Sequence, residues 1–147
     1  MSVVESLIET AIEFTVPLVP PSVNHYKAPV KYRVRGGGVR QGFAVTPEGM
    51  AFKAAVAVLA RGRSIAYVTP SERRLGRYRL DVKVFLGVDQ RGDGDNFWKC
   101  IGDGVKEAGV IHSDARVRVW NLEVCDEDRE NPRTEIRASR YEREAKD

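Results

Sequence analysis

The sequence predicts an α+β (mixed α/β) fold in which a small mixed β-sheet packs against two main helices. Residues 78–86 alternate apolar and polar side chains, which is the pattern of a half-buried strand. Residues 46–61 and 95–108 carry the patterns of helices, and 117–124 has strand character. The 147 residues are enough for a single domain. We expect its core at about 12–124 and a charged C-terminal tail at 126–147.

The N-terminal part predicts one strand followed by a loop. Residues 12–18 alternate apolar and polar side chains well enough for a strand, which the prolines Pro17, Pro20 and Pro21 would end. Residues 22–26 read as a loop that returns from this strand.

A basic, acid-free segment follows at 27–44. Two short runs flank the glycines 36–38, so the pattern predicts a hairpin or a flexible arm. Its cations are Lys27, Lys31, Arg33, Arg35 and Arg40, interleaved with Tyr32 and Phe43. Such an arm suits phosphate-backbone contacts and base stacking, and a solvated surface loop is the alternative.

The first helix has a clear start signal. Thr46 is a favoured N-cap residue, Pro47 suits the first helical position, and Glu48 places an acid in the first turn. We expect irregular structure at 62–76, with a second basic patch at Arg73, Arg74 and Arg77. Residues 133–139 are expected to add an edge strand.

The polar turn before the second helix is the main functional candidate. Asp93 and Asp95 stand two residues apart, and both would point to one face of an extended segment. Either Asp95 or Asn96 would cap the helix, and Lys99 would lie one turn inside it. The helix would stop at Gly109, and a third carboxylate, Asp114, follows before the next strand. We expect the three aspartates and Lys99 to gather around one end of this helix.

Three carboxylates held close together repel one another, so such a cluster calls for a cation that prefers oxygen ligands, such as Mg²⁺. The cation would lower the pKa of a bound water, and Lys99 would stabilise developing negative charge. A metal-dependent phosphodiesterase site is therefore the leading hypothesis.

Several residues of this region also fit other roles. An EF-hand loop fails because Phe97 and Trp98 occupy positions that need other residue types. Asp103, four residues after Lys99, is expected to form a surface ion pair with it. The apolar residues of the helix, Phe97, Ile101, Val105 and Ala108, are expected in the core or at a dimer interface. Gly102 and Gly104 suggest that another element, such as a partner subunit, approaches closely.

Net charge, cysteine spacing and the length of apolar runs indicate the class of protein. The net charge is +3 and the pI is about 9.0, which leaves polyanion binding open. Cys100 and Cys125 have no metal-type spacing, which favours free thiols in a reducing compartment. No apolar run is long enough for a membrane span, and Glu5 and Glu9 interrupt the start, so a signal peptide is not expected. These features predict a cytoplasmic protein.

Two motifs resemble those of the RusA-type Holliday junction resolvases, a family of crossover junction endodeoxyribonucleases. The first is Asp93-x-Asp95-Asn96-x-x-Lys99, continued by Asp103, Ala108-Gly109-Val110 and Asp114. The second is Pro20-Pro21-Ser22-x-Asn24-x-Tyr26. The resemblance covers about 14–124. Ser113 stands where the family commonly has an acid, and the stretch 89–92 is less basic than in some members.

The resemblance implies a RusA-like, obligate homodimer, bacterial or phage-encoded and nucleoid-associated, that acts in DNA recombination and repair. It would cut four-way DNA junctions with Mg²⁺ or Mn²⁺ by paired symmetric nicks that leave 5′-phosphate ends. The implied metal ligands are Asp93, Asp95 and Asp114, which are catalytic together with Lys99. The supporting residues are Asn24, Asn96 and Asp103. The candidate DNA contacts are Lys27, Lys31, Arg33, Arg35, Arg40 and Arg91.

Two alternatives stay open. The chain is a non-catalytic branched-DNA-binding protein that keeps the fold, or it is a metal-dependent hydrolase of a nucleotide or another phosphoester, with the basic arm incidental.

Overall fold

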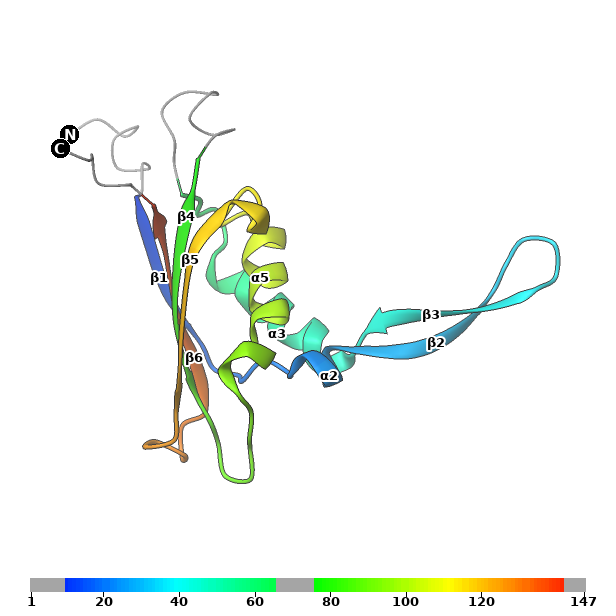
Figure 1. Ribbon diagram of the computed structural model, residues 1–147, viewed down its shortest axis with the longest axis horizontal. Helices are drawn as coiled ribbons and strands as arrows, with labels where there is room; N and C mark the ends of the chain where they lie inside the picture. The colour runs from blue at the N-terminus through cyan, green and yellow to red at the C-terminus, as the bar shows by residue number, and fades with distance from the viewer. Residues whose placement is uncertain (1–9, 66–75, 142–147) are drawn as a thin grey trace.

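The computed structural model describes residues 10–65 and 76–141 (Figure 1). Its strands are β1 (Ala11–Val16), β2 (Lys27–Arg33), β3 (Val39–Val45), β4 (Tyr78–Phe85), β5 (Val117–Cys125) and β6 (Arg133–Arg140). Its helices are α2 (Val23–Tyr26), α3 (Pro47–Leu59) and α5 (Trp98–Glu107), with 3-10 turns η1 (Gly94–Asn96) and η2 (Asp114–Arg116). The expected cations Arg73 and Arg74 lie outside the described residues.

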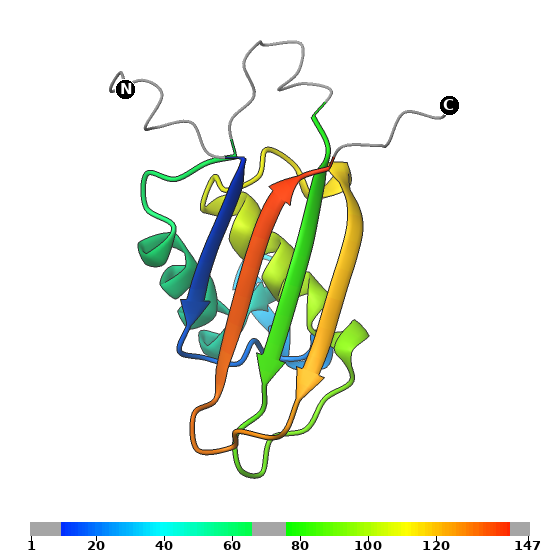
Figure 2. The same ribbon diagram turned by 90° about the vertical axis from the view of Figure 1, so that its left-hand side faces the viewer.

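The body of the molecule is a four-stranded mixed sheet in the order β1-β6-β4-β5. Strands β4 and β5 run parallel, whereas β6 is antiparallel to both β1 and β4. Helices α3 and α5 pack on each other and cover one face of the sheet, and the opposite face is open (Figures 1 and 2). The predicted α+β class, with a small mixed sheet and two main helices, is confirmed.

The core lies between this sheet and the two helices. In β4 the residues at even positions, Leu80, Val82 and Val84, are buried as the alternating pattern predicts. They pack with Phe52 of α3 and Ile101 of α5 in one apolar cluster. Burial of these side chains is the main source of stability for the sheet and both helices.

Helix α3 begins as predicted. Thr46 is its N-cap, and the Thr46 hydroxyl oxygen accepts a hydrogen bond from the amide of Gly49 at 3.3 Å. Helix α5 begins differently from the prediction, because η1 comes first and Phe97 is the N-cap, without a side-chain capping bond. Its end is as predicted, since Gly109 adopts a left-handed φ of 81° just beyond the last turn.

Two sequence expectations were wrong. The segment 22–26 contains a short helix, α2, instead of a loop throughout. Strand β6 is an interior strand between β1 and β4, not an edge strand. Its Thr134, Ile136 and Ala138 are buried, so the core extends past 124 into the segment expected as a charged tail.

The basic segment forms the predicted hairpin. Strands β2 and β3 pair from Lys27↔Val45 to Arg33↔Val39 as a separate two-stranded sheet. Gly36 and Gly37 take φ values of 102° and 94° in the turn, which glycine adopts without strain. The hairpin projects well away from the body (Figure 1).

Within residues 10–65 and 76–141, no helix is long and apolar enough to cross a membrane. Cys100 and Cys125 are free thiols, as the sequence predicted, and both are buried.

Candidate functional site

The acidic turn lies between β4 and α5, close to the end of β5. Asp93 is extended, with φ −88° and ψ 145°, and Asp95 lies inside η1. The two carboxylates therefore do not sit on one extended segment, contrary to what the sequence analysis had assumed. Gly94 packs on β5, because a Cβ built there would lie 3.0 Å from Leu122 Cδ2. Both aspartates are exposed to solvent.

Lys99 is held on the first turns of α5 by Asp103. Lys99 Nζ lies 3.2 Å from Asp103 Oδ1, which confirms the predicted ion pair. The Tyr26 hydroxyl donates to the other oxygen, Asp103 Oδ2, at 2.8 Å. Burial, followed by this bond to Asp103, raises the pKa of Tyr26. The Lys99 side chain is 51% exposed and the Asp103 side chain only 19%. The largely buried Asp103 carboxylate therefore holds the solvent-facing ammonium group of Lys99 in place.

The Tyr26–Asp103 contact joins the two sequence motifs. Tyr26 ends the proline-rich motif and is 1% exposed, yet sequence reasoning gave it no role at the site. Its place in the same motif as Asn24 was the available signal. Asn24 lies on α2 and lines a depression at the root of the arm together with Lys27 and Thr46. The basic arm therefore starts beside the N-terminal half of α5.

Asp114 does not join this group within one chain. Asp93 and Asp95 come before α5, and Asp114 comes after it, at the start of η2 and β5. Helix α5 has ten residues and so spans about 15 Å. Figure 2 shows η1 near the lower end of β5 and η2 at its upper end. The expectation that three aspartates surround one end of the helix is wrong for a single chain.

The carboxylates of the turn are available for ligands. Among the residues that the structure describes, no three His, Cys, Asp or Glu side chains form a group that would hold a metal ion. In the same residues, no salt bridge involves Asp93, Asp95 or Asp114. Mg²⁺ is commonly bound by one or two carboxylates with substrate phosphates as further ligands, so the pair Asp93 and Asp95 fits this ion.

The apolar face of α5 belongs to the core. Phe97, Ile101 and Val105 are at most 2% exposed. The two glycines of α5 are explained within the chain: the Trp120 ring covers Gly102, and α3 packs beside Gly104. Burial raises the pKa of the Cys100 thiol to about 12, so this cysteine is a core residue and not a nucleophile.

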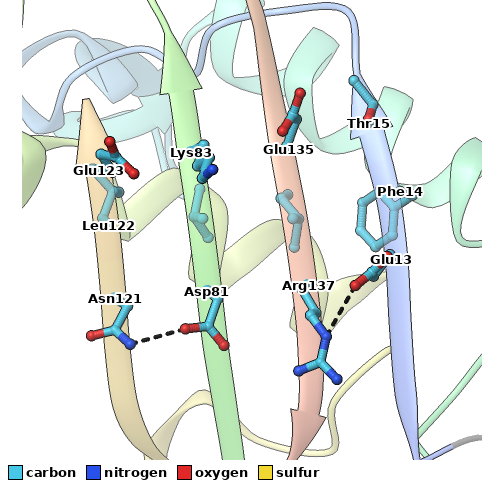
Figure 3. Close-up of a pocket in the computed structure, with 12 residues that line it drawn as sticks. Glu13, Phe14, Thr15, Asp81, Lys83, Asn121, Leu122, Glu123, Glu135 and Arg137 are labelled. Carbon is cyan, nitrogen blue, oxygen red and sulfur yellow. Dashed lines mark hydrogen bonds and ion pairs between the residues drawn. The ribbon is translucent and has the colours of Figure 1, made fainter. Parts of the chain in front are cut away.

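A second depression, of about 590 Å³, lies on the open face of the sheet (Figure 3). Two of its cross-strand contacts join polar or charged side chains at one end of the depression. Arg137 Nε lies 3.0 Å from Glu13 Oε1, and Asn121 donates to Asp81 at 2.9 Å. Arg79 bonds Asp81 as well, and its guanidinium holds the pKa of that carboxyl below its usual range. Because Asp81, Arg137 and Glu13 are held in these contacts, we place no catalytic group among them.

The predicted DNA contacts fall in two places. Lys27, Lys31, Arg33 and Arg40 are exposed on the two strands of the arm, and Arg35 is exposed in its turn. Arg91 is exposed in the loop that leads to the acidic turn. The arm also exposes Phe43 to 74% and Tyr32 to 49%, which are high values for aromatic side chains.

No protein-family model matches the chain, and the search of curated proteins found no match either.

Proposed function

We propose that this chain is a metal-dependent, structure-selective DNA endonuclease that resolves four-way junctions by paired nicks. One observation carries the proposal: the exposed Asp93–Asp95 turn and the Asp103-anchored Lys99 lie at the end of α5 where the basic arm is rooted. A phosphodiester bound along the arm would thus reach carboxylates and a lysine at once.

Each residue has a chemical role in this proposal. Asp93 and Asp95 would hold Mg²⁺ or Mn²⁺ through hard oxygen atoms. When bound, the ion supplies an activated water and offsets charge on the leaving oxygen. Lys99 would stabilise the negative charge that develops on the scissile phosphate. Asp103 positions Lys99, and Tyr26 positions Asp103. Hydrolysis would leave a 5′-phosphate and a 3′-hydroxyl.

The arm would supply most of the affinity for DNA. It has no acidic residue between 27 and 45, so its cations are free to neutralise phosphates. Phe43 lies opposite Pro29, on the face of the hairpin that also carries Lys31 and Arg33. An exposed aromatic ring among cations suits stacking on unpaired bases at a branch point. An isolated hairpin is only marginally stable, which favours an arm that becomes ordered on a partner.

A second candidate is a non-catalytic protein that binds branched DNA. The position of Asp114 favours it, because one chain gathers only two of the three expected carboxylates. The Lys99–Asp103 ion pair beside the acidic turn favours catalysis. A protein that only bound DNA phosphates would gain little from carboxylates near its lysine, because they repel the phosphates.

The test is a cleavage assay on an end-labelled synthetic four-way junction beside linear duplex, with and without Mg²⁺. We expect Mg²⁺-dependent paired nicks in the junction and much weaker cutting of the duplex. Asp93→Asn should bind the junction and not cut it. Asp89→Asn is the matched control, because it removes the same charge from an exposed position in the same loop.

The outcomes separate the hypotheses. Tight junction binding with no nicks in Mg²⁺ or Mn²⁺ would favour the non-catalytic protein. Hydrolysis of small phosphoesters without DNA cleavage would favour the third alternative, a hydrolase of nucleotides or related phosphoesters. Equal loss of activity in Asp89→Asn and Asp93→Asn would remove the acidic turn from the mechanism.

A further inference from the structure

We infer that the sheet holds a phosphate-binding site at the end where β6 stops and β4 starts, in a depression lined by Ser139, Arg79 and Arg137. This site lies at the opposite end of β4 from the acidic turn, and β4 itself spans about 26 Å. The inference goes beyond the proposed function, because its test needs neither a metal ion nor DNA cleavage.

The lining of this depression has the chemistry of an anion site. The depression has a volume of about 450 Å³, and among the described residues no carboxylate lines it. Its polar lining consists of three arginines and three hydroxyl-bearing residues: Arg79, Arg137, Arg140, Thr10, Ser139 and Tyr141. Guanidinium and hydroxyl groups donate hydrogen bonds, and the planar guanidinium group matches the oxygens of a phosphate.

The hollow follows from the sizes of side chains on neighbouring strands. Ser139 of β6 lies opposite Ala11 of β1 and opposite Arg79 of β4, so two small side chains share a row with a long one. Arg137 stands two residues before Ser139 and is therefore on the same face of β6. The two small side chains form the floor of the depression, and the two arginines form its walls.

The Ser139 hydroxyl has no hydrogen-bond partner within the protein. Ser139 is only 7% exposed, yet its side chain makes no hydrogen bond within residues 10–65 and 76–141. In the same residues, no side-chain oxygen or nitrogen is both fully buried and unpaired, so the hydroxyl oxygen must open into the depression. Nearly buried polar groups normally have a partner, and an oxygen of a bound anion would supply it here.

Both wall arginines are oriented by carboxylates that leave some of their donors unused. Asp81 binds Arg79 through Nε and Nη2. Glu13 Oε1 lies 3.0 Å from Arg137 Nε. In the part of the chain that the structure describes, Arg79 Nη1 and both terminal nitrogens of Arg137 have no partner. Figure 3 shows these nitrogens of Arg137 directed away from Glu13, towards the end of β6. The fixed guanidinium groups reduce the entropy cost of binding a ligand.

A phosphate group fits this set of donors. Its oxygens would accept from both guanidinium groups and from the Ser139 hydroxyl at once. The phosphate would come either from the backbone of a nucleic acid or from a free phosphate ion. Both sources present the same oxygens, so the experiments below separate them.

The first test is a titration of inorganic phosphate into the full chain at constant ionic strength, followed by amide NMR. We expect saturable shifts at Arg79 and at 137–141, and no such shifts when sodium chloride replaces phosphate. Shifts confined to the arm, 27–45, or shifts that never saturate, would overturn the site.

Variants test the named donors. Ser139→Ala removes the hydroxyl and should weaken phosphate binding about three- to tenfold, as loss of one hydrogen bond does. Arg137→Lys keeps the charge but loses the planar fork, and it should weaken binding by a similar factor. The matched control is Arg118→Lys, at an exposed arginine of β5 outside the depression, which should bind phosphate normally. Urea unfolding checks that each variant is folded. Unchanged binding in folded Arg137→Lys would overturn the inference.

A short DNA duplex separates the two sources of phosphate. If a backbone phosphate occupies the depression, the duplex shifts the amides of 137–141, and Arg137→Lys lowers its affinity whereas Arg118→Lys does not. If the duplex shifts only the arm while inorganic phosphate still shifts 137–141, the site takes a free phosphate ion. If neither ligand shifts 137–141, the inference is wrong, and the proposed function is untouched because the acidic turn and the arm lie elsewhere.

Discussion

The two ends of α5 differ in how the chain enters and leaves the helix. At the N-terminal end, an exposed turn with Asp93 and Asp95 leads into a helix whose N-cap, Phe97, makes no side-chain bond. At the C-terminal end, Gly109 reverses the chain into buried Val110 and Ile111. Backbone amides there are satisfied locally: Ile65 donates to the Val110 carbonyl oxygen, and His112 donates to the Tyr78 hydroxyl at 3.0 Å.

This difference suits the N-terminal end of α5 to ligand binding and the C-terminal end to a structural role. The C-terminal end completes its hydrogen bonds inside the protein, whereas the N-terminal end leaves two carboxylates and the Lys99 ammonium facing solvent. Helix N-termini attract anions, so an open N-terminal end with a nearby cation site suits a phosphate ligand. Asp114 is the one predicted site residue near the C-terminal end of α5.

The largest expected contrast is in catalysis. Lys99→Ala removes the cation near the N-terminal end and should slow junction cleavage about 100-fold, as loss of a charge-stabilising donor typically does. Lys106→Ala removes an exposed cation from the last turn and should leave the rate near normal. Single-turnover rates at saturating Mg²⁺ measure both. Near-normal cleavage by Lys99→Ala would exclude this lysine from the mechanism.

Glycine substitutions test the packing at each end. A Cβ at Gly92 would overlap the buried Phe97 ring, so Gly92→Ala should lower the free energy of unfolding by about 1–3 kcal/mol. Gly109→Ala meets no close neighbour but must hold a φ of 81°, which costs about 1 kcal/mol. Urea unfolding of the two variants gives the comparison. A larger loss in Gly109→Ala than in Gly92→Ala would contradict the tight packing assigned to Gly92 against Phe97.

Alkaline pH should destabilise the N-terminal half of α5. Burial raises the pKa of Cys100 to about 12, and burial with the Asp103 bond raises the pKa of Tyr26. Groups with raised folded-state pKa values lend stability that is complete below their unfolded pKa values and falls as pH rises towards the folded ones. The free energy of unfolding should therefore decrease above about pH 9, by up to about 1.4 kcal/mol per pH unit for each group.

Variants identify the groups responsible for this slope. Cys100→Ala should make the decline above pH 9 shallower, and Ser113→Ala, at the other end of the helix, should not change it. Denaturant titrations at several alkaline pH values measure the slope directly. Identical slopes in the unaltered protein and Cys100→Ala would contradict the assignment.

The smallest contrast concerns two tyrosine hydroxyls, one at each end. Tyr26→Phe removes the donor to Asp103, and Tyr78→Phe removes the acceptor for the His112 amide. Each should cost about 1 kcal/mol of stability, the net value of one hydrogen bond. Only Tyr26→Phe should also slow cleavage, by a few-fold, because Asp103 then positions Lys99 less firmly. Equal rates in the two variants would leave Tyr26 with a purely structural role.

Local signals predicted most of the elements. Thr46 and Pro47 marked the start of α3, Gly109 marked the end of α5, and alternation in 78–86 gave β4. Strand β6 was misplaced because its partners, β1 and β4, are far away in sequence. Its buried residues alternate with Arg and Glu, so the segment looked like a surface strand. Pairing between strands so far apart in sequence leaves no pattern within the strand itself that would predict it.

The geometry of the carboxylates depended on topology. Because β4 and β5 are parallel, the connecting helix α5 must carry the chain back to the opposite end of the sheet. Asp93 follows the end of β4 and Asp114 precedes the start of β5, so they lie at opposite ends of the sheet. The order strand, helix, strand already implied that Asp93 and Asp114 lie far apart. The spacing of the motif, taken alone, suggested that they lie close together.

Paramagnetic broadening by Mn²⁺ along α5 tests the central claim most directly. In amide NMR spectra with substoichiometric Mn²⁺, an ion bound at the acidic turn predicts strong broadening at 92–97 that weakens along α5 towards 113–116. Broadening that is as strong at 113–116 as at 92–97, or stronger, would contradict an ion held by Asp93 and Asp95. No broadening in either segment would contradict the metal-dependent nuclease itself.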